Sequence, residues 1–339
     1  LYFPAGILLL FPSTRITLLR RKYISYFHGI FASYIAELVV HVCGVKMSLY
    51  TDDPVILKEK SNCLVISNHR TRIDWMFSYY YYGVLINMGS CIRIIVKDML
   101  KSLPIYGWAM QHCLYIFLQR SRENDIPHIY NTMSYLLRTS ERIALLLFPE
   151  GTDLSASNIK KSNAYAAKNG LPEYQHVLHP KSTGLFVALQ AMRHHGGCVH
   201  DITVAFKDRN DGERPGEKEL MLVAFSCTAY HSVFQWVRDR FTKKEKLLES
   251  FYNNEPKRVP KLRTEDASSA DSELWPKQIR IPSLRSNYLN FGIFFTLQLA
   301  VVLSLLFSNP FRWFVALVVI SYVVVTSIRG YDQLELLLH

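Results

Sequence analysis

Two long apolar segments near the C-terminal end of the chain restrict the folds that the whole chain can adopt. No charged residue occurs from Ser286 to Phe311, and the stretch LNFGIFFTLQLAVVLSLLF is close to the roughly 20 residues that a helix needs to cross the hydrocarbon layer. After Arg312, a second uncharged segment, Trp313 to Ile328, is slightly shorter. These segments predict a transmembrane hairpin within residues 286–339; the alternative is a buried core helix followed by a strand.

The N-terminal segment, residues 1–49, is also predicted to lie at a membrane. The opening LYFPAGILLLF has the composition of a hydrophobic helix, and the cations that follow it are expected on the cytosolic side. The next apolar stretch, Ile24 to Val45, contains ionisable groups, which are costly inside the hydrocarbon layer, so an interfacial or re-entrant helix is favoured over a clean span. The cations are Arg15, Arg20, Arg21 and Lys22, and the ionisable groups are His28, Glu37 and His41.

Between residues 50 and 252, short apolar segments alternate with segments of helical periodicity. This alternation is typical of an α/β domain, here expected to have a central mixed sheet flanked by helices. A polar, proline-broken stretch over residues 253–285 predicts a linker to the hairpin. The candidate strands are Cys63–Ser67, Ile92–Val96, Leu114–Leu118, Ile143–Phe148, Ile202–Phe206 and Met221–Cys227. The candidate helices are Asp74–Tyr82, Asp125–Arg142, Ser182–His194 and Val233–Tyr252.

Charge and cysteine content narrow the possible partners. Lys and Arg number 39 against 28 Asp and Glu, a balance that suits a membrane surface or an anionic ligand. The basic residues are dispersed, and together with the apolar segments this favours a lipid bilayer over nucleic acid. The six cysteines form no C-x-x-C pair and the histidines between 176 and 200 show no convincing ligand spacing beyond H-x-x-H, so no metal site is expected. The sequence leaves the oligomeric state open.

The stretch NHRTRIDW, residues 68–75, places His69 five positions before Asp74, between an apolar strand and an aromatic helix. On a continuous helix the two side chains would point about 140° apart, so they can meet only if the chain turns between them. A strand–loop–helix junction supplies that turn, and Asp74 can then accept the Nδ1–H of His69 and leave Nε2 to take a proton. The alternative is a plain capping box with Thr71 as the N-cap.

The same loop carries Arg70 and Arg72 beside a helix N-terminus, which is a favourable place for a phosphate. A histidine poised as a base, two cations and an aromatic face together predict a substrate with a hydroxyl, a phosphate and an apolar tail. No G-x-S-x-G sequence occurs, so a covalent acyl-enzyme is not indicated.

Four blocks of the sequence resemble those of the glycerolipid acyltransferases, the lysophosphatidate acyltransferase-like family with an H-x4-D block. They are NHRTRIDW, VKDMLKSLPIYGWAMQ, LLLFPEGTDLS and VLHPKSTGL, in the family's order over about 120 residues. Their form, with KNGL and HDITVAF, is most similar to the lysocardiolipin acyltransferase branch. The resemblance implies transfer of a fatty acyl group from acyl-CoA, as co-substrate without a further cofactor, to a lysophospholipid. It also implies that His69 is the general base and that Asp74 orients it.

The other blocks contain further candidate substrate-binding residues. Glu150, Gly151 and Thr152 follow an apolar strand at its carboxyl end, where open α/β sheets place ligands, although a simple strand-ending turn is the alternative. Lys97 ends another strand and is a candidate phosphate ligand or a solvated lysine. The remaining candidates are Asn68 in the first block and Pro180, Lys181, Ser182 and Thr183, which open a helix with an anion-friendly terminus. For His179 a hydrogen-bonded structural role is favoured over a catalytic one.

One position departs from the family. Many lysophosphatidate acyltransferases have an arginine after the E-G-T, whereas this chain has Asp153, for which a helix cap is the structural alternative. The anion shifts the expected acceptor from a small phosphomonoester to lysocardiolipin, lysophosphatidylglycerol or lysophosphatidylinositol. Two alternatives stay open: a lysophosphatidate acyltransferase that makes phosphatidate, and a catalytically silent lipid-binding scaffold. The resemblance points to the endoplasmic reticulum membrane, with the catalytic domain facing the cytosol.

Overall fold

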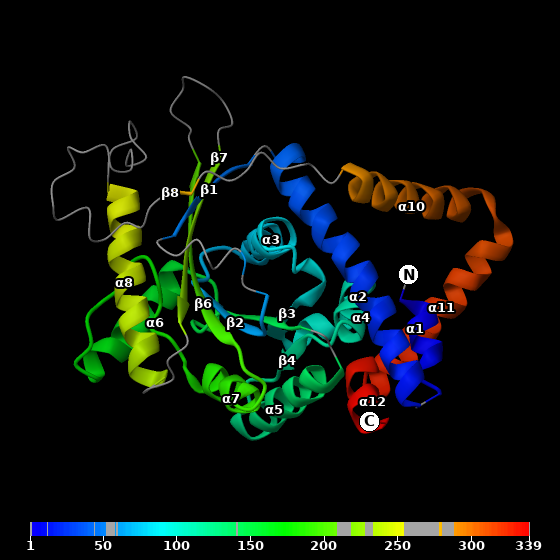
Figure 1. Cartoon of the computed structure of the whole chain (residues 1–339), viewed down its shortest axis with the longest axis horizontal. Helices are drawn as coiled ribbons and strands as arrows, with labels where there is room; N and C mark the ends of the chain where they lie inside the picture. The colour runs from blue at the N-terminus through cyan, green and yellow to red at the C-terminus, as the bar shows by residue number, and fades with distance from the viewer. Residues whose placement is uncertain are drawn as a thin grey trace.

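The structure is a computed structural model of an α/β domain with long apolar helices packed along one side (Figure 1). It describes residues 2–11, 13–43, 45–51, 58, 60–139, 142–208, 218–227, 233–253, 278–279 and 288–338. The linker predicted over residues 253–285 lies almost entirely outside the described residues.

Within the described residues, eight strands form one sheet in the order β4-β3-β5-β2-β6-β7-β1-β8. Five neighbouring pairs are parallel, and β6 with β7 and β1 with β8 are antiparallel, so the sheet is mixed, as predicted. Two short strands, β1 and β8, were not expected from the sequence. The strands are β1 (Val45–Tyr50), β2 (Cys63–Ser67), β3 (Ile92–Lys97), β4 (Ile116–Leu118), β5 (Ala144–Leu147), β6 (Cys198–Asp208), β7 (Lys218–Cys227) and β8 (Gln278–Ile279).

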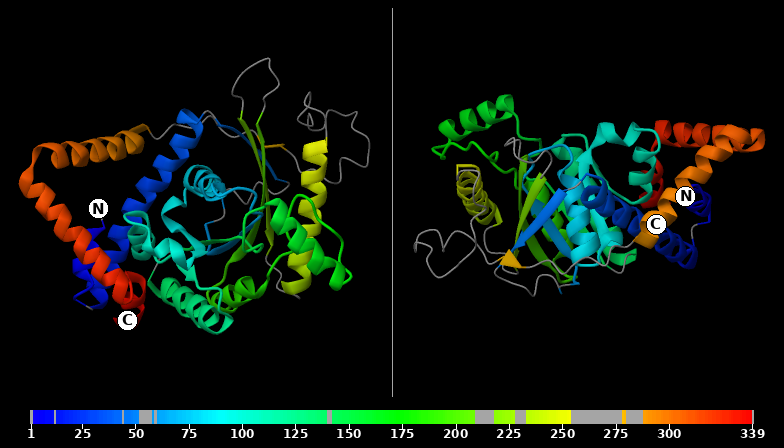
Figure 2. Two further views of the ribbon diagram at one scale, coloured as in Figure 1. Left: turned by 180° about the vertical axis from the view of Figure 1, so that it is seen from behind. Right: turned by 90° about the horizontal axis from the view of Figure 1, so that it is seen from above.

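Helices cover both faces of the sheet. The central strands are therefore apolar on both faces, because each face packs against a layer of helices. In β2, Cys63 and Val65 pack into one core with α2 and α3, while Leu64 and Ile66 pack into the other with α5, α7 and α8. Each such aliphatic side chain contributes roughly 1.5–3 kcal/mol when fully buried. Figure 2 shows the sheet between α8 and α2. These helices are α2 (Thr14–Glu37), α3 (Asp74–Tyr80), α5 (Arg122–Thr139), α7 (Thr183–Met192) and α8 (Val233–Asn253).

Helix α5 begins three residues earlier than predicted, and α6 (Ala156–Lys168) was not among the candidate helices, although Asp153 was considered as a helix cap. Asp125, the first residue of the predicted helix, lies within α5, accepts the backbone N–H of Gln119 at 2.9 Å and closes the turn before the helix. In α6 only Ala166 is buried, so the segment has no apolar stripe from which a helix could be read.

The terminal helices lie together on one side of the domain. After α1 (Phe3–Leu8), α2 covers the first part of the segment Ile24 to Val45 that was expected to be interfacial, and a π-helix, Leu38–Val42, extends it. Helices α10 (Tyr288–Phe307) and α11 (Asn309–Ile328) meet at Ser308 and diverge from it (Figures 1 and 2). Helices Thr14–Val40 and Asn309–Ile328 are long and apolar enough to cross a membrane. Helix α12 (Tyr331–Leu338) then returns the chain to the domain.

Candidate active site

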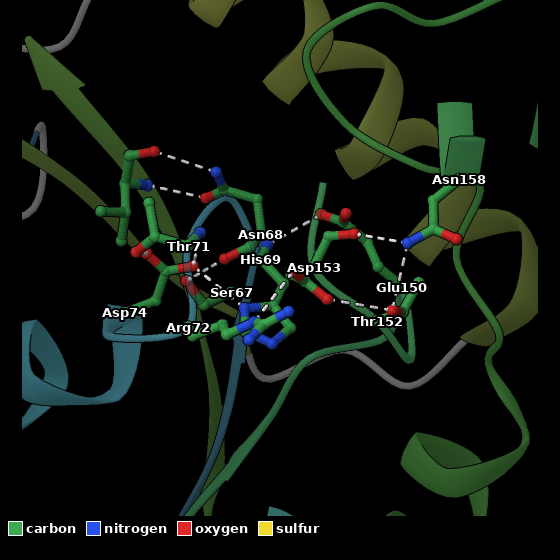
Figure 3. Close-up of polar contacts among 11 residues, drawn as sticks. Ser67, Asn68, His69, Thr71, Arg72, Asp74, Glu150, Thr152, Asp153 and Asn158 are labelled. Atoms are coloured by element: carbon green, nitrogen blue, oxygen red, sulfur yellow. Dashed lines mark hydrogen bonds and ion pairs between the residues drawn. The ribbon is translucent and has the colours of Figure 1, made fainter. Parts of the chain in front are cut away.

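The candidate site lies where β2 and β5 end side by side. These strands are parallel neighbours, so the loops that leave them emerge at the same edge of the sheet. The backbone N–H of His69, on the first loop, donates to Glu150 Oε1 at 3.0 Å, and the carbonyl of His69 accepts the N–H of Leu154 at 2.8 Å. Figure 3 shows the first of these bonds, between His69 and Glu150. Both sides of the His69 backbone are therefore fixed by the loop after β5.

The His69 ring and the Asp74 carboxylate meet as the sequence predicted. Nδ1 of His69 lies 3.0 Å from Asp74 Oδ2, and Asp74 also accepts the N–H of Thr71 at 2.8 Å and the Thr71 hydroxyl at 2.6 Å (Figure 3). The Asp74 side chain is 2% exposed, whereas that of His69 is 21% exposed and stacks on Phe148. A buried carboxylate thus orients a partly exposed imidazole and leaves Nε2 as the ring nitrogen available for a proton.

The predicted capping box is only half correct. The N-cap of α3 is Ile73, which has no side-chain cap, and Thr71 lies before the helix. Asp74 does reach back to the N–H of Thr71, which is the second half of the motif. The same carboxylate therefore closes the turn and orients His69.

Asn68 is buried and holds the loop to the neighbouring strand. Its amide donates to the carbonyl of Val204 at 2.9 Å and accepts the N–H of Val204 at 2.7 Å, so both polar groups are engaged with the backbone of β6. In this arrangement Asn68 positions the loop that carries His69.

The two arginines of the loop have different surroundings. The guanidinium of Arg70 lies over the ring of Tyr252, 4.1 Å from its centroid, at the C-terminal end of α8. Arg72 is 90% exposed, and its Nε lies 3.7 Å from Asp153 Oδ2. The helix cap considered for Asp153 is wrong, because the N-cap of α6 is Ser155. Burial opposes ionisation of Asp153, but hydrogen bonds from its own backbone and Thr152, with the Arg72 cation, lower its pKa.

Glu150 is a buried carboxyl beneath the loops. Burial raises the pKa of Glu150 well above its ordinary value, against the hydrogen bond from the His69 N–H. Its Oε2 has no hydrogen-bond partner among the described residues. Glu150 is thus an acceptor for the loop that carries the base.

A basic pair approaches Gly151. Gly151 has a φ of +74°, which only glycine adopts readily, and a Cβ built there would lie 3.7 Å from the Lys181 Nζ. The Lys181 N–H donates to the carbonyl of Pro149 at 2.7 Å, and Arg120 reaches the carbonyl of Gly151 at 3.4 Å. Arg120 was not among the sequence candidates, although its position just after β4 at the same sheet edge was a usable signal.

The remaining candidates make few side-chain contacts with other described residues. Lys97 is exposed at the end of β3, Pro180 is half-buried, and Ser182 is the N-cap of α7 without a side-chain cap bond, followed by Thr183. Thr152 donates to Asp153 at 3.2 Å. His179 makes structural contacts: its Nε2 lies 2.9 Å from the carbonyl oxygen of Pro172, and its ring stacks on that of Tyr174. Within the described residues, no group of three or more His, Cys, Asp or Glu could hold a metal ion.

Comparison with known proteins identifies the family. A family model described as Acyltransferase matches residues 50–207, which include all four sequence blocks. The chain is 38% identical to lysocardiolipin acyltransferase 1 of Danio rerio over 64% of this chain and 58% of the relative. It is 33% identical to lysocardiolipin acyltransferase 1 of Gallus gallus over 89% of this chain and 81% of the relative. The chain belongs to the glycerolipid acyltransferase family.

The family membership that the four sequence blocks predicted is therefore confirmed for this glycerolipid acyltransferase. Among solved structures, the 1-acyl-sn-glycerophosphate (LPA) acyltransferase PlsC from Thermotoga maritima aligns with a TM-score of 0.45 at 14% identity, over 75% of this chain and 98% of that chain.

Proposed function

We propose that this glycerolipid acyltransferase moves a fatty acyl group from acyl-CoA to a free hydroxyl of a lysophospholipid, with His69 as general base. The observation that carries the proposal is the 3.0 Å contact between His69 Nδ1 and the buried Asp74 carboxylate. The rest of the His69 ring is partly exposed, so a substrate can reach it. A base held in this way contributes roughly 10²–10⁴ in rate.

In the proposed step, the hydroxyl oxygen attacks the thioester carbonyl carbon while Nε2 of His69 takes the hydroxyl proton. The tetrahedral intermediate then expels the CoA sulfur: the carbon–sulfur bond breaks, the new ester remains, and His69 returns the proton to the thiolate. No acyl group is attached to the protein at any stage. The fixed backbone of His69 keeps Nε2 in place, so less reorganisation is needed in the transition state.

The acceptor is proposed to be a lysophospholipid with a phosphodiester headgroup, with lysocardiolipin, lysophosphatidylglycerol and lysophosphatidylinositol favoured. The Asp153 carboxylate lies on the loop beside His69 and disfavours a doubly charged phosphomonoester. Lys181 and Arg120, which both approach Gly151, are the cations proposed to receive the headgroup phosphate. The names of the two relatives agree with this preference.

The test is acyl transfer by the full chain in detergent micelles, from labelled acyl-CoA to a panel of lysophospholipids that includes lysophosphatidate, with products identified by mass. His69→Ala should lower kcat by about 10²–10⁴-fold, whereas His195→Ala, an exposed histidine after α7, should leave it unchanged. Lys181→Gln should raise the KM for the acceptor more than it lowers kcat.

Two outcomes would contradict the proposal. A wild-type chain that transfers no acyl group to any acceptor would support the lipid-binding scaffold. A clear preference for lysophosphatidate would remove the headgroup assignment but leave the role of His69 intact.

The site is further proposed to face the cytosol from the endoplasmic reticulum membrane, because acyl-CoA is made and kept in the cytosol. The candidate spans Thr14–Val40 and Asn309–Ile328 support association with a membrane. Protease digestion of intact microsomes tests the orientation: cleavage in the α6–α7 region without detergent is expected, and protection of that region would reverse the assignment.

A further inference from the structure

The segment from the end of β3 to the first residue of α4 (Tyr106–His112) presents a group of large apolar side chains to the outside of the molecule. It comprises the short helix η5 (Asp98–Ser102) and the turn after it. Met99 is 74% exposed, Ile105 71% and Tyr106 66%, and Leu103 is also exposed. Isolated exposed apolar residues are common, but four within eight consecutive positions form a patch that marks an interaction site.

The backbone holds these side chains outward by a tight and strained turn. Ile105 has a φ of +67°, a conformation that is rare and unfavourable for a β-branched residue. Two backbone bonds of 2.7 Å close the turn, from Tyr106 N–H to Pro104 and from Gly107 N–H to Leu103. A Cβ at Gly107 would lie 2.3 Å from the Lys101 carbonyl, so η5 and α4 can pack this closely only at a glycine. Strain of this kind persists where the surrounding structure enforces it, often for function.

The patch is fixed beside the end of a candidate membrane span. Lys101 Nζ, in the same segment, donates to the carbonyl of Arg329 at 3.1 Å and to Asp332 at 3.0 Å, just after α11 ends. Trp108 of α4 stacks on Tyr322 of α11, with ring centroids 4.7 Å apart. Figure 1 shows α4, α11 and α12 gathered on the same side of the domain. The end of α11 defines the depth at which a bilayer surface would lie, and the Lys101 contacts hold the segment that carries the patch beside that end.

We propose that residues 99–106 enter the interfacial layer of the lipid bilayer. They would thereby hold the sheet edge that carries the candidate site against the membrane surface. The segment begins just after β3, which pairs with β5, and β5 in turn pairs with β2, whose loop carries His69. Apolar and aromatic side chains on a rigid turn are suited to the boundary between headgroups and acyl chains. A lipid acceptor would then reach the sheet edge from the membrane without crossing water.

The test is site-specific photo-crosslinking of the full chain in nanodiscs of phosphatidylcholine and phosphatidylglycerol. The photoreactive residue p-benzoylphenylalanine replaces Ile105 or, in a second variant, Met99. The positive control is Leu317, an exposed residue of α11 that is expected to face lipid. The negative control is Phe234, an exposed residue of α8, which packs on the face of the sheet opposite α2 and α3. Lipid adducts at 105 and 99 are expected at a yield comparable to that at 317 and at least about fivefold above that at 234.

Lipid adducts at 105 and 99 no more abundant than at 234, with adducts at 317 present, would overturn the proposal. Cross-links at 105 to a second copy of the chain would overturn it too, because the patch would then be a protein interface. The readout does not use acyl transfer, and the same adducts are expected in the His69→Ala chain, so failure of this proposal is distinct from failure of the proposed reaction.

Discussion

Asp74 accepts three hydrogen bonds, and its bond with His69 is the one that bears on proton transfer. In Asp74→Asn, one oxygen becomes an NH₂ group that cannot accept the Nδ1–H, so the imidazole loses its fixed tautomer and orientation. We expect kcat to fall by about 10²–10⁴-fold with little change in the KM for acyl-CoA. Steady-state kinetics with labelled acyl-CoA measure both constants.

Thr71→Val is the matched control for this variant. It removes only the hydroxyl donor to Asp74 and leaves the backbone N–H of Thr71 in place. A smaller loss of kcat than in Asp74→Asn is expected. Equal losses in the two variants would mean that the carboxylate acts by closing the turn rather than by orienting His69.

The buried carboxyl of Glu150 predicts a pH dependence of stability. Burial raises its pKa in the folded chain, so the stability that it contributes is fully present below its ordinary pKa of 4.5 and is lost as the pH rises toward the folded value. Glu150→Gln cannot ionise but keeps an oxygen for the His69 N–H. We therefore expect the thermal midpoint of Glu150→Gln to fall less than that of the wild type from acidic to alkaline pH.

Thermal unfolding of the detergent-solubilised protein across this pH range measures the difference. Glu173→Gln, at an exposed position, should follow the wild type. A Glu150→Gln chain whose midpoint falls as steeply as that of the wild type would show that Glu150 is not the group responsible.

At the scale of single residues, the sequence predicts contacts that are local and misses those that are not. His69 and Asp74 could be paired because one strand–helix junction contains both. The partner of Asn68 lies 136 positions away on β6, and Arg70 finds Tyr252 only because α8 ends beside the loop. Sequence spacing carries no information on such pairs, and the assignment of both side chains to substrate stays a prediction.

At the scale of elements, the bounds of a strand or helix were predicted best where apolar side chains mark its buried face. The candidate β2 was exact because CLVIS is buried on both faces, and α8 was placed nearly to its ends by its apolar stripe. The prediction was wrong for β1, because VKMSLY was read in part as the end of an apolar helix, and α6 was missed because it is largely solvated.

The attachment of α8 to the sheet depends on a buried ion pair. Lys244 is fully buried, pairs with Asp201 of β6 at 2.7 Å and donates to the carbonyl of Ile202. Among the described residues, Lys244→Met leaves Arg240 as the one cation paired with Asp201, so the free energy of unfolding should fall by about 3–5 kcal/mol. The adjacent exposed Lys243→Met should change it by less than about 0.5 kcal/mol.

Denaturant or thermal unfolding monitored by circular dichroism measures both variants. An Asp201→Asn, Lys244→Met double variant should recover part of the loss, because a neutral amide at position 201 does not need the buried Lys244 cation. A Lys244→Met chain as stable as the wild type would show that hydrophobic packing alone attaches α8.

At the scale of the whole molecule, the two terminal segments are joined inside the protein. Glu335 of α12 pairs with Arg20 and Arg21 of α2, and the hydroxyl of Tyr135 donates to it at 2.7 Å. The sequence placed these arginines at the cytosolic surface of a membrane, because nothing in it indicates a partner 315 positions away. The segment after the predicted hairpin thus packs against α2, near the N-terminal end of the chain.

Glu335→Gln tests this closure. The variant keeps the shape of the side chain but leaves two buried guanidinium groups without a carboxylate, and loss of one member of a buried pair costs about 3–5 kcal/mol. We expect a lower thermal midpoint and faster proteolysis of α12, because the Lys101–Asp332 contact remains as its main ionic attachment. Glu249→Gln, on the exposed side of α8, is the control. Unchanged proteolysis of α12 in Glu335→Gln would mean that apolar packing against Trp108 and Tyr322, and not the charge cluster, holds the two ends of the chain together.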